Sequence, residues 1–371
     1  MKILEVTNVD FSLRHFLLPL MQGLRARGHE VVGVCADGPL LADVRADGFR
    51  VEALPMARSL SPVAQARAFM ALVRLIRAEK PDLVHAHMPI SGVLTRFAAR
   101  LCGVGVIAYT CHGFLFNQPG PWPRRVVALV LEWLAGWVTD RFLTVSEEEA
   151  RDARRLCIHP RAVAIGNGRP PARFHPDAQA RTRLRMEMGV PEATIVVIVV
   201  SRLVRHKGHP ELLSAMEQVP DAELWVVGDR LPSDHGEILE GAFTEAARPD
   251  RLGTRLRRLG YRTDIANLLA AADIFALPSH FEGLPMSVIE AMLCGLPVIA
   301  TDIRGPREQV VPEQTGLLVP PMSVAPLSAA LRRLVSDAPL RARMGEAGRL
   351  RACTLYDETL IVGRTLDLLG A

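Results

Sequence analysis

The order of short apolar runs and helix-like segments is the feature that most restricts the fold of this chain. Five runs in the first half are continuously apolar and have the length of strands, at 2–7, 30–36, 82–87, 105–110 and 141–146. Helical patterns lie between them, at 14–27, 62–79, 91–102 and 123–138. Continuous hydrophobicity is typical of strands covered on both faces, so this order predicts a doubly wound parallel sheet of the α/β class.

The same pattern starts again in the second half. A loop rich in proline, glycine and arginine covers 166–177, and further apolar runs follow it at 194–201, 222–228, 273–279 and 297–302. We therefore predict two facing Rossmann-like domains, 1–175 and 176–352, with a central cleft, and a final helix within 353–371 that returns to the first domain. Ligands of open parallel sheets bind beyond the carboxyl ends of the strands, so the residues after each run are the candidates for a site.

Composition favours a folded protein of the cytoplasm. The amino-terminal MKILEVTN has the pattern of a strand and not of a signal peptide. The most apolar helix candidate, 126–138, is too short to span a bilayer and contains Glu132. The six cysteines show no metal-binding spacing, which is typical of reduced thiols. We expect no metal site and no cofactor.

Charge is distributed unevenly along the chain. Residues 1–175 hold 22 lysines and arginines against 15 acidic residues, whereas the remainder holds 22 against 25. A basic first half indicates an anionic partner. Nucleic acid is not the expected partner, because the sequence has neither an aromatic-rich basic patch nor a helix-turn-helix pattern.

The segment SRLVRHKG, 201–208, directly follows a predicted strand. Arg202 and Lys207 should therefore lie at the ligand edge of the second sheet. An arginine that can bind two oxygens together with the point charge of a lysine suits a diphosphate. The alternative is a solvated basic loop.

The segment HFEGLPMSVIEA, 280–291, follows the next predicted strand. Gly283 lets the backbone approach a ligand, and a helix that begins near Met286 would direct free N–H groups to a phosphate. Glu290, one turn into that helix, suits the hydroxyls of a ribose, and Glu282 suits those of a sugar beyond the diphosphate. The alternative is that both glutamates are structural or cap the helix.

These two segments, the strand GLPVIATD and the segment TGLLVPP (315–321) resemble glycosyltransferase family 4 over nearly the whole chain. The resemblance implies the GT-B fold and a retaining, metal-independent transfer from a nucleotide sugar. It implies that Arg202 and Lys207 bind the diphosphate, Glu290 the ribose and Glu282 the donor sugar. The remaining donor-binding residues that it implies are Gly283, Leu284, Pro285 and Met286, with Tyr261 and Arg262 at the nucleobase.

Histidines follow two strands of the first half. The resemblance implies that His112, in TCHGF, contacts the donor sugar; the alternative is a packed histidine at a strand end. His85 and His87 share one face of their strand and are expected to line the cleft or the core. Two histidines without a third ligand nearby are weak evidence for a metal.

The loop after the first strand departs from the family. Many members have a double glycine there that approaches the donor phosphate and the acceptor, whereas this chain reads TNVDFSLRHF. We expect Asp10, Phe11 and Ser12 to take over that role.

A membrane surface is the expected location of the first domain. Arg67, Arg74 and Arg77 fall on one face of a predicted helix, and Trp122, Arg124 and Arg125 precede a strongly apolar one. Basic and aromatic residues together are typical of peripheral membrane enzymes. The alternative is that Trp133 and Trp137 belong to the core.

Together these features predict a peripheral enzyme on the inner face of the cell membrane. It would transfer a hexosyl or N-acetylhexosaminyl group, from a UDP-sugar in preference to a GDP-sugar, to a polyprenyl-diphosphate-linked saccharide in bacterial polysaccharide or glycan assembly. The alternatives are a soluble small-molecule acceptor, a nucleotide-sugar epimerase of the same architecture, and a member without activity that serves as a membrane-bound partner.

Overall fold

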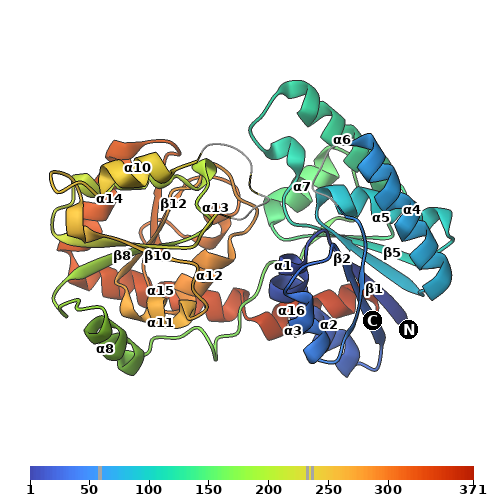
Figure 1. Ribbon diagram of the computed structural model, residues 1–371, viewed down its shortest axis with the longest axis horizontal. Helices are drawn as coiled ribbons and strands as arrows, with labels where there is room; N and C mark the ends of the chain where they lie inside the picture. The colour runs from blue at the N-terminus through green and yellow to red at the C-terminus, as the bar shows by residue number, and fades with distance from the viewer. Residues whose placement is uncertain (57–60, 231–233, 235–237) are drawn as a thin grey trace. The chain divides into compact units, whose positions relative to one another are not determined.

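The computed structural model describes residues 1–56, 61–230, 234 and 238–371. It divides the chain into two compact units, of which the first comprises 1–167 with 358–371 and the second 168–357 (Figure 1). The chain thus passes between the units at 167/168 and 357/358, where the sequence suggested 175/176 and 352/353.

The first unit is built on a seven-stranded sheet in the order β3-β2-β1-β4-β5-β6-β7, in which all neighbours are parallel. The strands are β1 (Lys2–Val6), β2 (Glu30–Cys35), β3 (Arg50–Ala53), β4 (Leu83–His87), β5 (Val106–Cys111), β6 (Arg141–Thr144) and β7 (Val163–Ala164). The strand order reverses between β1 and β4, which creates a switch point where Rossmann-like sheets bind ligands.

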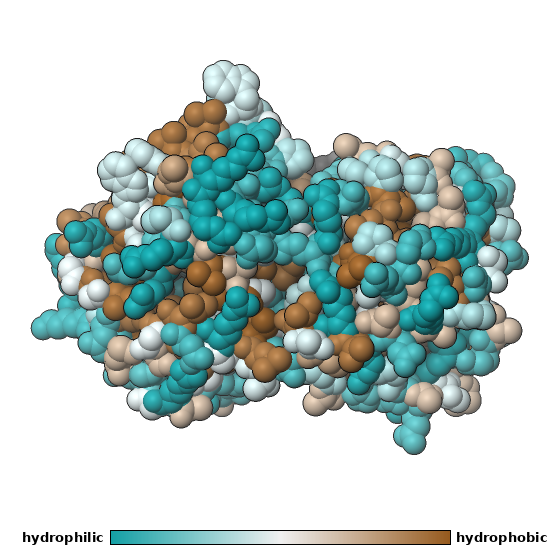
Figure 2. Space-filling model, turned by 180° about the vertical axis from the view of Figure 1, so that it is seen from behind, coloured by the Kyte–Doolittle hydropathy of each residue, from teal (hydrophilic) through white to brown (hydrophobic). Residues whose placement is uncertain are grey.

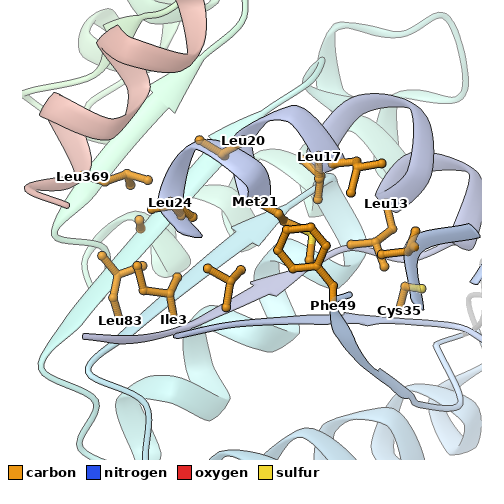
Figure 3. Close-up of a cluster of buried hydrophobic side chains, with 14 of the residues drawn as sticks. Ile3, Leu13, Leu17, Leu20, Met21, Leu24, Cys35, Phe49, Leu83 and Leu369 are labelled. Atoms are coloured by element: carbon orange, nitrogen blue, oxygen red, sulfur yellow. The ribbon is translucent and has the colours of Figure 1, made fainter. Parts of the chain in front are cut away.

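Helices cover both faces of the first sheet. One face carries α1 (Asp10–Ser12), the π-helical turn η1 (Leu13–Leu17), α2 (Leu18–Ala26), α3 (Leu41–Ala46) and α16 (Glu358–Leu369), and the other carries α4 (Pro62–Glu79) and α5 (Pro89–Leu101). The turn η2 (Leu115–Asn117), α6 (Trp122–Gly136) and α7 (Glu147–Arg155) complete the unit. Figure 3 shows the core on the α2 face, where Leu13, Leu17 and Met21 pack over the sheet.

The last helix packs in the first unit. Leu366 and Leu369 of α16 belong to the same core as α2 (Figure 3). A side chain at Gly23 of α2 would lie 2.6 Å from Val362 of α16, so a residue without a side chain is needed where the two helices meet.

The second unit has a six-stranded parallel sheet in the order β10-β9-β8-β11-β12-β13. Its strands are β8 (Ile195–Val200), β9 (Ala222–Val227), β10 (Leu256–Gly260), β11 (Ile274–Leu277), β12 (Val298–Thr301) and β13 (Gly316–Val319). Its helices are α8 (Ala178–Glu187), η3 (Arg205–Lys207), α9 (His209–Glu217), α10 (Glu240–Ala246), η4 (Gly253–Arg255), α11 (Ile265–Ala271), α12 (Met286–Leu293), α13 (Pro306–Gln309), α14 (Val324–Ser336) and α15 (Ala338–Leu355). Here the strand order reverses between β8 and β11.

The predicted α/β class with two doubly wound parallel sheets is confirmed. The continuous apolar runs became strands that are buried on both faces, such as β8 and β11. The sequence did not identify β3, β7, β10 or β13 as strands. All four lie at sheet edges, and β3, β7 and β10 are also partly exposed, so the hydrophobic signal of those three is weak.

Candidate active site

The loops that follow β8 and β11 pack together at the switch point of the second sheet. Gly208 has a φ of +77°, and a side chain there would lie 2.0 Å from the carbonyl oxygen of Pro278, so only glycine allows this approach. The ring of His206 stacks on Phe281 with 4.5 Å between centroids. The backbone N–H of His280 donates to the carbonyl of His206 at 2.8 Å. The two segments singled out in the sequence therefore form one surface.

Lys207 and Glu282 are in direct contact on this surface. Lys207 Nζ lies 2.6 Å from Glu282 Oε1, and the hydroxyl of Ser279 donates to the same oxygen at 2.7 Å. Both charged side chains are mostly buried, so water screens their interaction little. The arrangement presents a cation beside a carboxylate that can accept further hydrogen bonds. Ser279 had no distinguishing signal in the sequence.

Arg202 has a partner that the sequence did not indicate. Its guanidinium forms an ion pair with Asp234, which is almost fully buried, while Arg202 itself remains accessible. The two residues are 32 positions apart. An anion that binds Arg202 would therefore share the guanidinium with this carboxylate.

The amino terminus of α12 opens onto the same loops. Among the described residues no side chain caps this terminus, so the first N–H groups, from Met286 onward, are available to an anion. The turn that precedes α12 packs against α13 and the glycine before it. A side chain at Gly305 would lie 1.8 Å from the carbonyl oxygen of Gly283, and the amide of Gln309 donates to the carbonyl of Pro285 at 2.9 Å. Leu284 is buried in this turn.

Glu290 lies one turn into α12 and is nearly buried. The Nε group of Arg169 donates to its Oε1 at 2.7 Å. Arg169 stands at the start of the second unit, where its N–H donates to the carbonyl of Tyr356 at 2.9 Å. The carboxylate proposed for a ribose is therefore fixed by an arginine 121 positions away, a pairing without any local sequence signal.

Tyr261 and Arg262 follow β10. The ring of Tyr261 is exposed, and Arg262 forms two hydrogen bonds with Asp264, of 2.8 and 2.6 Å. Gly260 adopts a φ of +66° immediately before them. Their expected place beside a nucleobase stays a prediction.

In the first unit, the three histidines gather around a carboxylate that the sequence analysis overlooked. Glu5 Oε1 accepts from His85 Nδ1 at 3.1 Å, and Glu5 Oε2 accepts from His87 Nε2 at 2.8 Å. His87 Nδ1 lies 3.2 Å from His112 Nε2. Glu5, His85 and His87 are fully buried and His112 is half-buried. The only hint in the sequence was an acidic residue within an otherwise apolar strand.

Burial and neighbouring charges determine the protonation of this cluster. Burial lowers the pKa of His87 to about 4 and that of His112 to about 3, so both rings are neutral near pH 7. Burial by itself would raise the pKa of Glu5, but its electrostatic attraction to His85 and the hydrogen bonds from His85 and His87 hold that pKa at about 2. Potential ligand atoms of Glu5, His85 and His87 also lie within 4.8 Å of one another, which is close enough to hold a metal ion.

The glycine-free loop forms α1 and η1. The carboxylate of Asp10 accepts from the N–H of Leu40 at 3.1 Å and from that of Phe11 at 2.8 Å. The ring of Phe11 lies 4.5 Å from that of His15, and Ser12 is buried. These contacts stabilise the loop, and its expected role toward donor and acceptor stays a prediction.

Helix α6 buries its one acidic residue and exposes a row of aliphatic residues. Glu132 is buried, where Arg96 Nη2 lies 2.7 Å from its Oε2 and the hydroxyl of Tyr109 donates to its Oε1 at 3.2 Å. The opposite face exposes five aliphatic residues, namely Val126, Val127, Val130, Leu131 and Leu134. Apolar side chains gather over α6 in the space-filling view (Figure 2).

Tryptophans flank this apolar face. Trp122 is 74% exposed and Trp137 is 70% exposed, so the alternative that Trp137 belongs to the core is wrong, and Trp133 is partly buried beside it. Basic side chains are exposed nearby on α6 and on α4: Arg124, Arg125, Arg67, Arg74 and Arg77. None of the helices in the described part of the chain has the length and hydrophobicity needed to cross a membrane.

Comparison with known proteins agrees with this architecture. Residues 13–168 match the model of the glycosyl transferase 4-like domain, and residues 180–351 match that of glycosyl transferases group 1. The UDP-Gal:alpha-D-GlcNAc-diphosphoundecaprenol alpha-1,3-galactosyltransferase of Escherichia coli is 30% identical over 358 residues, which cover 90% of each chain. The N,N'-diacetylbacillosaminyl-diphospho-undecaprenol alpha-1,3-N-acetylgalactosaminyltransferase of Campylobacter jejuni is 26% identical over 99% of this chain and 98% of its own.

A solved structure shares the fold over the whole chain. Anabaena HepE, in complex with UDP and glucose, superimposes with a TM-score of 0.86 at 22% identity and covers 100% of both chains. The chain therefore belongs to the glycosyltransferases of the group 1 and family 4 type, with the GT-B architecture. The resemblance inferred from the sequence is confirmed.

The buried state of His206 predicts a pH effect on stability. Burial, with the charges of Lys207 and Arg202, lowers the pKa of His206 to about 4 from its ordinary value of 6.5. As the pH falls below 6.5 the unfolded chain takes up a proton that the folded chain does not, so the free energy of unfolding should fall between pH 6.5 and 4. His206→Phe keeps the stacking on Phe281 and removes this titration. Urea unfolding at a series of pH values should give a flatter profile for the variant; a slope as steep as that of the wild type would contradict the prediction.

Proposed function

We propose that this glycosyltransferase moves a sugar from a nucleotide sugar to a hydroxyl of a polyprenyl-diphosphate-linked saccharide, with retention of the anomeric configuration and without a metal ion. The observation that carries the proposal is the convergence of Lys207, Glu282 and the uncapped start of α12 on one surface of the second unit. A diphosphate and a sugar need this combination of cationic groups, backbone N–H donors and carboxylate acceptors.

The donor is proposed to be a UDP-sugar, with GDP-sugars as the alternative. The Escherichia coli relative is named for UDP-Gal, and it is similar to this chain over 90% of both sequences. In the proposed arrangement Lys207, Arg202 and the N–H groups of α12 bind the diphosphate. Glu290 accepts hydrogen bonds from the ribose, and Glu282 and His112 from the transferred sugar.

The proposed mechanism is substitution on one face of the sugar. The bond between the anomeric carbon and the diphosphate oxygen breaks, a bond to the acceptor oxygen forms on the same face, and the acceptor proton passes to the departing diphosphate. The named relatives form alpha linkages, and an alpha-linked donor that yields an alpha product retains its configuration. Lys207 and the α12 dipole would stabilise the negative charge that develops on the diphosphate, which is the effect of greatest weight in such sites.

The acceptor is proposed to be lipid-linked, as part of bacterial polysaccharide or glycan assembly. Both named relatives act on diphosphoundecaprenol-linked saccharides. The apolar face of α6 between Trp122 and Trp137 suits the interface of a bilayer, where tryptophan is favoured. The exposed arginines of α4 and α6 suit anionic headgroups. This location would be the inner face of the cell membrane.

Nucleotide binding tests the donor site. With UDP at ~100 times its dissociation constant, the free energy of unfolding should rise by about 2.7 kcal/mol. Glu290→Ala should abolish most of this gain because the ribose loses its carboxylate partner. Glu313→Ala is the matched control, since Glu313 also pairs with an arginine (Arg333) in the same unit but on an exposed surface. Thermal-shift measurements with UDP, GDP and their sugars provide the readout. If neither UDP nor GDP raises the melting temperature, the assignment of the donor site is contradicted. An equal rise in Glu290→Ala and in the wild type contradicts the role of Glu290.

Turnover tests the chemistry. Lys207→Ala should lower kcat by about 10²–10³-fold, the usual cost of removing one group that stabilises developing charge. Arg258→Ala is the control, because Arg258 pairs with Glu240 on the surface of the same unit and should leave kcat unchanged. The assay follows both sugar transfer and release of the nucleotide. Normal turnover of Lys207→Ala would refute its role, and interconversion of the nucleotide sugar without release of nucleotide would indicate the epimerase alternative.

Vesicle binding tests the membrane surface. Replacement of Val127, Val130 and Leu131 by serine removes exposed apolar area from α6, and binding to phosphatidylglycerol-containing vesicles should fall by more than about tenfold. The control replaces Met186 and Leu350 by serine; both are more exposed than the three α6 residues but lie in the second unit, and this variant should bind as the wild type does. Co-sedimentation at low and high salt gives the measurement. Equal binding of both variants would exclude α6 as the docking surface.

A further inference from the structure

A row of polar residues at the ligand edge of the first sheet requires an explanation. Ile3, Leu83 and Ala108 on this face belong to the apolar core, whereas the strand ends carry Glu5, His87 and their neighbours. The register pairs Glu5 with His85, and His87 with Thr110. The polar residues are therefore confined to the carboxyl ends of β1, β4 and β5, beside the switch point between β1 and β4.

Burial of Glu5 is unfavourable unless its oxygens are hydrogen-bonded. An apolar residue in place of Glu5, like those that form the rest of this face, would avoid the free-energy cost of burying a carboxylate. An ionised carboxylate can only accept hydrogen bonds, so both histidine nitrogens that contact it must carry protons. Glu5 thus requires a proton on His87 Nε2, which lies 2.8 Å from Glu5 Oε2.

The state of His87 determines that of His112. His87 is fully buried, which disfavours a charged ring, and in a neutral ring a proton on Nε2 leaves Nδ1 as an acceptor. The group 3.2 Å from this nitrogen is His112 Nε2, which must then be the donor. A neutral His112 that donates through Nε2 carries no proton on Nδ1. Donation runs in one direction, from His112 to His87 to Glu5.

We propose that Glu5 and His87 are positioning residues that hold His112 in one orientation and one tautomer, with its Nδ1 as an acceptor for a hydroxyl of the sugar substrate. The inference rests on the proposed function, in which His112 contacts the transferred sugar. Without these hydrogen bonds the imidazole of His112 could rotate. It could also carry a proton on Nδ1, and that proton would repel the hydrogen of the sugar hydroxyl from which Nδ1 has to accept a hydrogen bond.

A metal ion bound by Glu5, His85 and His87 would give His112 the opposite tautomer. The hydrogen-bonded chain already provides a partner for each nitrogen of the two histidines, since His85 Nε2 lies 2.8 Å from the hydroxyl of Thr110. A metal bound at His87 Nε2 would move the proton of a neutral ring to Nδ1. That proton would be donated to His112 Nε2, and His112 would then carry its own proton on Nδ1. The tautomer of His112 therefore distinguishes the two states.

The first test reads that tautomer directly. The full chain, labelled with ¹⁵N-histidine, is measured by NMR at pH 7, and the His112 signals are identified by their loss in His112→Asn. We expect a protonated Nε2 and an unprotonated Nδ1. Glu5→Met, which removes both acceptor oxygens at similar length, should give a mixture of tautomers at His112. Thr110→Val alters only the far partner of His85 and should keep the wild-type pattern. A wild-type proton on His112 Nδ1, or an unchanged tautomer in Glu5→Met, overturns the proposal.

The second test uses two substitutions of His87 and does not depend on the folding of Glu5→Met. In His87→Gln the amide can still donate to Glu5 and accept from His112, whereas His87→Phe can do neither. Affinity for UDP alone should be unchanged in both variants. Affinity for the UDP-sugar should fall about tenfold in His87→Phe, the loss of one oriented hydrogen bond, and recover in His87→Gln. Equal affinities of the two variants for the UDP-sugar overturn the proposal. Failure of the wild type to bind any nucleotide instead refutes the proposed function. The tautomer of His112 still tests the hydrogen bonds from His112 to His87 and from His87 to Glu5 in that case.

Discussion

Parallel pairing of strands at two switch points is the constraint on which the chemistry of this protein depends. The pairing of β8 with β11 places the loops that follow them side by side, so Lys207 meets Glu282 although they are 75 residues apart. The pairing of β1 with β4 likewise unites Glu5 with His87 across 82 residues. Polar side chains that directly follow buried strands can meet only at this edge, because the faces of both sheets are covered by helices.

Close backbone approach and paired charges hold the loops of the candidate site together. Gly208 and Gly305 remove the side chains that would otherwise separate the loops. Lys207 is held by Glu282, and Glu290 is held by Arg169. Both carboxylates keep further oxygen lone pairs, and in the proposed function these accept hydrogen bonds from sugar hydroxyls.

Helix α6 shows how an interior ion pair determines what the exterior presents. Arg96 stacks on Tyr109, with 3.8 Å to the ring centroid, and binds the carboxylate of Glu132. This contact faces the single acidic residue of α6 inward. The aliphatic residues of the helix are then turned outward, between Trp122 and Trp137. The orientation, and not the composition, creates the apolar surface.

The sequence by itself determined the class of fold, the main strands and the family, because continuous apolar runs and the residues after them are local signals. It singled out Lys207, Glu282 and the start of α12 as candidates for the same reason, and the structure brings them together, while their roles stay predictions. Only the tertiary structure decided the partners: Asp234 for Arg202, Arg169 for Glu290, and Glu5 for His87. These pairs depend on register and on loops that pack across 32 to 121 positions, which hydrophobic periodicity does not record. The outward face of α6 was hidden for a related reason, since an apolar helix has the same composition whether it covers a core or faces a membrane.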